Sequence, residues 1–145
     1  MLEMHDRSFA NVGQSEQSHM DAVATLLTRY DVPDPASGMA AGDFANADLQ
    51  SLYDALVDQG SFSRLAALSV GVEIEELDIH DIEDLSAEVT HPDILAVYDN
   101  LARGSRNHLR TFYGKLVAAG GAYTPKHLDS EVFGSIVAAT MERGR

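Results

Sequence analysis

The most informative absence in this chain of 145 residues is cysteine, of which there is none. Disulfide bonds and thiolate metal sites are therefore excluded, and the redox compartment cannot be inferred from cysteine usage. Any metal site must be built from carboxylates and imidazoles, a ligand set that suits iron, manganese and zinc.

Long apolar runs and basic residues are also scarce. No apolar run approaches the ~20 residues that a membrane-spanning helix needs. Residues 1–6 lack a basic stretch followed by an apolar one, so we expect no signal peptide and a cytoplasmic location. Ten Lys and Arg residues stand against 23 Asp and Glu residues, a formal net charge of −13. This balance argues against a nucleic acid or an anionic membrane surface as partner, because both need clustered positive charge.

Helical periodicity dominates what is present, and no stretch alternates strictly enough to predict a strand. The length suits a single domain over residues 1–145 with a hydrophobic core of its own. Helices are predicted over residues 8–30, 47–58, 61–85, 91–119 and 129–142.

Local signals place several of these helix ends. Asn46 is expected to cap the short helix. Thr90 is expected to cap the next-to-last helix, with Pro92 in its first turn and Asp93 completing a capping box. The connection over residues 31–60, which contains only the short helix, is long. A long crossover between helical hairpins is typical of ferritin-like bundles, so the sequence predicts an all-α, ferritin-like fold.

Ionisable residues interrupt the apolar stripe of the first predicted helix. Glu16 and His19 form a Glu-x-x-His pair about one turn apart on one face, an arrangement that metal-binding bundles use. The alternative is a Glu and a His at a solvated helix edge. The stripe consists of Phe9, Val12, Glu16, His19, Val23, Leu26 and Tyr30.

The helix predicted over residues 61–85 has a similar interruption. Glu75 stands where an aliphatic residue is expected, which makes it a candidate ligand. Asp78, three residues later, would reach the same region. The stripe consists of Leu65, Leu68, Val72, Glu75, Ile79 and Ile82.

This helix also carries a second apolar face, so the sequence leaves open which side faces the bundle centre. Glu73 and Glu76 are displaced around the helix from the stripe, and we expect both to be solvated. The second face consists of Val70, Ile74 and Leu77.

The fourth predicted helix places His108 at an inward position. A lone inward histidine is more often a satisfied core residue than a ligand. Ser105 precedes it by three residues, where a Glu-x-x-His pair would have its carboxylate. Arg106 and Arg110 flank this face and are expected to pair with acidic residues opposite.

Together, these residues predict a metal site with Glu16, His19, Glu75, Asp78 and His108 as ligands, supported by Ser105, Arg106 and Arg110. Bringing the acidic groups together without a cation would cost desolvation and like-charge repulsion, which bound Fe, Mn or Zn would offset. The metal-free alternative is a network of Arg, Glu and His hydrogen bonds.

Four blocks of sequence resemble a prokaryotic ferritin-like family catalogued as domain of unknown function 2202. The resemblance implies a bundle distantly related to rubrerythrins and ferritins, which hold two iron ions between carboxylates and histidines. It implies an architecture more than an activity, with iron-related redox or peroxide chemistry as the reaction class. The blocks are residues 15–23, Gly71 together with residues 74–79, residues 103–110 and residues 123–125.

The sequence departs from that family at two places. Ser105 replaces the carboxylate that rubrerythrin-like sites have three residues before the last histidine. Family members also have a helix before the first one predicted here, whereas only seven residues precede Ser8. The first bundle helix is therefore expected to be short or missing, which would expose an apolar stripe. The rival hypothesis follows: a non-enzymatic interaction module, or an inactive remnant, that dimerises through this stripe.

Overall fold

A computed structural model describes residues 7–144 of the chain. Within that range the structure contains helices and loops and no strand, which confirms the predicted all-α class. The five helices are α1 (Arg7–Arg29), α2 (Ala47–Ser61), α3 (Arg64–Glu88), α4 (Pro92–Ala118) and α5 (Ser130–Ala138).

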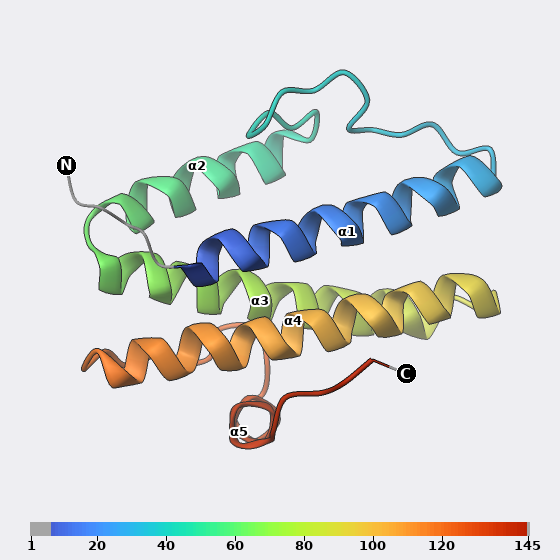
Figure 1. Cartoon of the computed structure of the whole chain (residues 1–145). Coiled ribbons are helices and arrows are strands. Elements are labelled where there is room, and N and C mark those ends of the chain that lie inside the picture. Colours follow the sequence, from blue (N-terminus) through green and yellow to red (C-terminus); the bar gives the residue numbers. More distant parts are fainter. Residues whose placement is uncertain (1–6, 145) are drawn as a thin grey trace.

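Three long helices, α1, α3 and α4, lie side by side (Figure 1). Helices α3 and α4 form a hairpin with the most extensive contact in the molecule, and α1 packs mainly against α4. Helix α2 covers α3, and α5 packs on α4. The α3–α4 hairpin is thus the scaffold to which the other helices attach.

The short helix begins as its sequence predicts. The Asn46 side chain accepts hydrogen bonds from the backbone N–H groups of Asp48 and Leu49, which satisfies two donors that the first helical turn leaves free. Most of the other predicted helix ends lie within three residues of the observed ones.

The start of α4 differs from its prediction. Its N-cap residue is His91, not Thr90, and no side chain caps the helix. Asp93 instead accepts hydrogen bonds from Arg29 at 2.6 Å and from the Tyr30 hydroxyl at 2.7 Å. The carboxylate expected to close a capping box therefore ties the end of α1 to the start of α4.

The last helix ends at Ala138, four residues before the predicted end at Glu142. Beyond it the chain is held by α4: Glu142 accepts hydrogen bonds from Arg106 at 2.7 and 2.8 Å and from Arg110 at 3.0 Å. Asn107 donates to the Glu142 carbonyl and accepts from its N–H, both at 2.9 Å. These hydrogen bonds to α4 take the place of the backbone bonds that a longer α5 would make.

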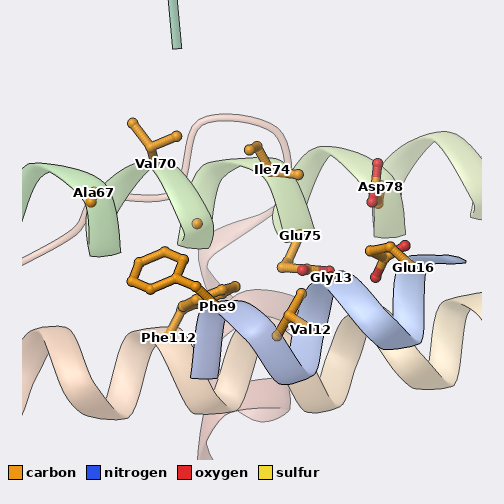
Figure 2. A pocket seen from close by; sticks show the side chains of 11 residues that line it. Phe9, Val12, Gly13, Glu16, Ala67, Val70, Ile74, Glu75, Asp78 and Phe112 are labelled. Carbon is orange, nitrogen blue, oxygen red and sulfur yellow. The ribbon is translucent and has the colours of Figure 1, made fainter. Parts of the chain in front are cut away.

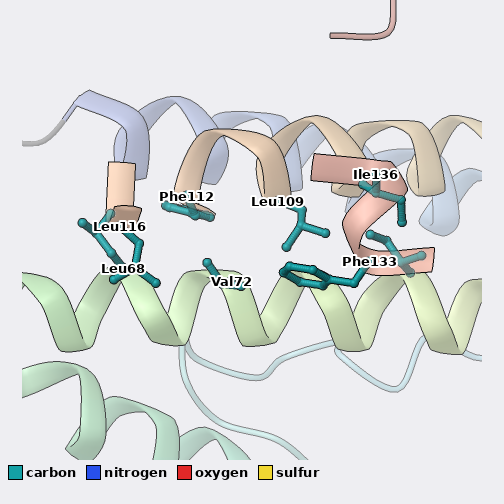
Figure 3. Packing of buried hydrophobic residues seen from close by; sticks show 8 residues of the cluster. Leu68, Val72, Leu109, Phe112, Leu116, Phe133 and Ile136 are labelled. Atoms are coloured by element: carbon teal, nitrogen blue, oxygen red, sulfur yellow. The ribbon is translucent and has the colours of Figure 1, made fainter. Parts of the chain in front are cut away.

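The hydrophobic core lies between α3, α4 and α5 (Figure 3). Burying each large apolar side chain stabilises the fold by about 1.5–3 kcal/mol. Gly71 leaves room for the Phe112 ring of α4 against α3, since a Cβ there would lie 2.9 Å from that ring. The core consists of Leu68, Val72, Ile79, Leu109, Phe112, Leu116, Phe133 and Ile136.

Glu76 is fully buried, so the expectation that it is solvated is wrong. It accepts hydrogen bonds from the Tyr123 hydroxyl at 2.6 Å and from the backbone N–H groups of Lys126, His127 and Leu128 at 2.8–2.9 Å. Burial raises its pKa, but these bonds lower it by more, so the pKa lies below the ordinary value. The loop between α4 and α5 is thereby fastened to α3.

Glu73 is not solvated either. Its side chain is 13% exposed and accepts a hydrogen bond from the Lys126 ammonium. The same loop therefore covers both glutamates, which sequence periodicity alone assigned to the solvent.

Among the described residues, no helix combines the length and apolar character needed to cross a bilayer.

Candidate metal centre

Three side chains from three helices converge between α1, α3 and α4. The Nδ1 atom of His108 lies 3.0 Å from Oε1 of Glu16 and 3.3 Å from Oε1 of Glu75. One potential ligand atom from each residue lies within 4.8 Å of the other two. Helix α3 therefore turns Glu75 toward α1 and α4, which settles the orientation that its two apolar faces left open.

His19 adds a second imidazole beside this cluster. Its Nδ1 lies 3.1 Å from Oε2 of Glu16, so the Glu16 carboxylate lies between two histidines. The centroids of the His19 and His108 rings are 6.1 Å apart. The structure thus brings Glu16, His19, Glu75 and His108 into one group.

Gly104 makes room for the His19 ring. A Cβ at this position of α4 would lie 2.6 Å from Cε1 and 2.8 Å from Nε2 of His19. Sequence reasoning did not identify Gly104, because nothing in the sequence of α4 shows that a ring from α1 needs this space.

Among residues 7–144, three buried atoms of the cluster have no hydrogen-bond partner: Oε1 of Glu16, Oε2 of Glu75 and Nδ1 of His108. The nitrogen is close to both carboxylates, but the geometry is not that of a ring N–H donating to either oxygen. Leaving a buried polar group unsatisfied costs about 1–3 kcal/mol, and more for a charged one. A cation between the three helices would satisfy all three atoms, so the residues fit a metal ion.

The pKa shifts of the cluster residues also indicate that a positive charge is favoured there. Burial raises the pKa of Glu75 above its ordinary value. Burial also lowers the pKa of His108, but Glu16 and Glu75 more than offset this and raise it to about 9. For Glu16 the effect of burial is smaller than that of the two histidines, and its pKa is lowered. Positive charge is therefore favoured at this position.

Asp78 lies beside the cluster and is not part of its three-atom core. It lines the same cavity as Glu16 and Glu75. Burial, followed by the charges of Glu75 and Glu16, raises the pKa of Asp78 to about 7.

The three predicted supporting residues separate into two groups. Ser105 is buried, and its hydroxyl partly opposes the effect of burial on the pKa of the Glu75 carboxyl. Arg106 and Arg110 bind Glu142 instead of the acidic residues of the cluster. The alternative network of Arg, Glu and His thus lacks the two arginines expected to form it.

A cavity of about 300 Å³ opens beside the cluster (Figure 2). Phe9 and Phe112 lie at one end, and Glu16 and Asp78 lie at the other. The lining residues are Phe9, Val12, Gly13, Glu16, Ala67, Val70, Gly71, Ile74, Glu75, Asp78 and Phe112.

Comparison with known proteins agrees with this architecture. The model of an uncharacterized protein domain, DUF2202, matches residues 3–140. The uncharacterized protein MJ0754 of Methanocaldococcus jannaschii is 43% identical over 136 residues, which cover 94% of this chain and 74% of that protein. The crystal structure of the same hypothetical protein superposes with a TM-score of 0.93 at 41% identity, covering 97% of this chain and 80% of that one. The chain therefore belongs to the DUF2202 family.

Proposed function

We propose that the chain binds a divalent transition metal through Glu16, Glu75 and His108. The observation that carries the proposal is a set of three buried ligand atoms from three different helices, none of which has a hydrogen-bond partner among the described residues. A carboxylate and imidazole donor set suits iron, manganese and zinc. In this proposal the fold is a ferritin-like bundle whose long helices position the ligands.

The remaining donors have distinct roles in the proposal. Ser105 orients Glu75, as groups behind metal ligands commonly do. His19 and Asp78 lie next to the cluster and would serve a second ion, as in a di-iron centre. A bound metal supplies Lewis acidity and, in the case of iron or manganese, one-electron redox chemistry.

The test is elemental analysis of protein purified without chelator, followed by zinc and manganese titration of the metal-free chain. We expect stoichiometric binding in the wild type and a large loss in Glu75→Gln and His108→Ala. Glu83→Gln, an exposed position on the same helix as Glu75, is the matched control and should bind as the wild type does. Trace metal content that the cluster substitutions leave unchanged would overturn the proposal.

A second proposal, self-association through α2, is supported by the apolar side chains that this helix and its C-terminal end expose. Leu49 and Val57 are each 50% exposed, Tyr53 is 40% exposed, and Phe62 is 81% exposed. A second copy packing on this surface would remove them from water. Light scattering over a wide concentration range tests this: Phe62→Ser should favour the monomer, and a wild type that is monomeric throughout would contradict it.

A further inference from the structure

The cavity beside the cluster has the size of a small-molecule site. Its volume of about 300 Å³ is comparable to the lower end of ligand pockets. An engineered apolar cavity of ~150 Å³ already holds benzene, so this one has room for roughly ten non-hydrogen atoms.

Most of the wall is apolar. Phe9 and Val12 of α1 and Val70 and Ile74 of α3 line it. Phe112 of α4 lies at the end away from Glu16 and Asp78 (Figure 2). Such a wall offers no hydrogen-bonding side chain to a sugar, a nucleotide or another highly polar ligand. The part of a ligand inside the cavity must therefore be hydrocarbon.

The other end of the cavity is polar and belongs to the metal cluster. Glu75 is 2% exposed, and its Oε2 atom has no hydrogen-bond partner. A divalent ion held by Glu16 and Glu75 would have no net charge together with them, and Asp78 adds further acidity. The Asp78 carboxylate disfavours an anionic head group there, and an ammonium group has no lone pair to offer a metal.

We propose that the cavity binds a small neutral molecule with an apolar body and a single hydroxyl or carbonyl oxygen placed against the cluster. This inference rests on the proposed metal binding and names the ligand class of that same site. The apolar body provides the binding energy by leaving water, and the oxygen fixes the orientation.

Two glycines allow the cavity to be tested without touching the cluster. Gly13 lines the cavity, and a Cβ added there would meet no atom within 4 Å. Leucine at this position would place its side chain in the cavity. Gly114 on α4 also has open space around an added Cβ but does not line the cavity, which makes Gly114→Leu the matched control.

The experiment is calorimetric titration of zinc-loaded protein with n-octanol and with octanoate. We expect n-octanol to bind the wild type and Gly114→Leu equally, and Gly13→Leu about tenfold more weakly, because the leucine side chain would occupy space that the octanol chain needs. Octanoate should bind more weakly than n-octanol. Equal n-octanol binding by the two leucine variants would overturn the cavity site, and tighter binding of octanoate would overturn the assigned head group.

Zinc content and molecular mass, measured on the same samples, separate this inference from the proposed function. Zinc bound by all three proteins without any n-octanol binding would overturn the inference alone. Failure of the wild type to bind either zinc or manganese would overturn the proposed function and this inference with it. If the cavity is instead covered by a second copy of the chain, the wild type will be a dimer in solution and n-octanol will not bind. Gly13→Leu will then change the molecular mass of the assembly.

Discussion

Glu75 and Glu76 are consecutive residues of α3 and are 2% and 0% exposed, yet their surroundings are opposite. Glu76 accepts four hydrogen bonds from the loop between α4 and α5, and its pKa is lowered. Glu75 has an oxygen without any partner and lies near another carboxylate, and its pKa is raised. Neither burial nor residue type distinguishes the two.

The difference lies in which donors the rest of the fold supplies. A buried carboxylate whose two oxygens both accept hydrogen bonds helps to hold the fold together, because these bonds offset the cost of its desolvation. One that is left unsatisfied costs stability and retains affinity for a cation. On this view Glu76 serves folding, and Glu75 serves the proposed metal site.

The largest expected effect is that of Glu76→Ala. It removes the acceptor of three backbone N–H groups and of the Tyr123 hydroxyl, so we expect about 3 kcal/mol of lost stability. Urea unfolding measures the loss. Zinc affinity of the folded fraction should be unchanged, and a parallel fall in affinity would break the distinction between the two glutamates.

Glu75→Gln should produce the reverse pattern. Without metal, its unfolding free energy should stay within about 1 kcal/mol of the wild type, because the Glu75 Oε2 atom has no hydrogen bond to lose and glutamine keeps the shape of the side chain. With zinc at a hundred times its dissociation constant, the wild type should gain about 2.7 kcal/mol and the variant almost nothing. Thermal melts with and without zinc decide this, and an equal zinc-induced shift in both proteins would contradict it.

Gly104→Ala tests whether His19 supports the proposed metal site. The added Cβ would force the His19 ring away from Glu16, and we expect about tenfold weaker zinc binding. Gly114→Ala is the control, because an added Cβ there has open space around it. It brings the same gain of about 0.5–1 kcal/mol in helix propensity. Identical zinc affinities in the two variants would show that His19 does not support the site.

The smallest effect concerns Glu142, a partly exposed counterpart of Glu76. Hydrogen bonds from Arg106 and Arg110 lower the pKa of Glu142 from 4.5 to about 2, although burial opposes them. A lowered folded pKa contributes stability above about pH 4.5, which is lost as the pH falls toward 2. Glu142→Gln should therefore melt below the wild type at neutral pH, with the difference shrinking below pH 4.5. A difference independent of pH would exclude this ion pair as its origin.

Much of the site could be anticipated from α1 and α4, where Glu16, His19 and His108 interrupt otherwise apolar stripes. The structure brings these three together with Glu75, and metal binding by them stays a prediction. Glu76 was misplaced for a definite reason. Both Glu75 and Glu76 fit the three-or-four spacing that links Val72 to Ile79, and periodicity cannot select one of them.

The sequence by itself determined the all-α class and most helix ends, because caps, breakers and periodicity act within a few residues of the chain. The family followed from the resemblance of four blocks of residues. Only the tertiary structure decided what faces each side of α3. This helix is buried both against α1 and α4 and against the loop that covers Glu76. The role of a buried carboxylate depends on hydrogen-bond donors that lie far away in the sequence. No local pattern therefore distinguishes the hydrogen-bonded carboxylate of Glu76 from the unsatisfied carboxylate of Glu75.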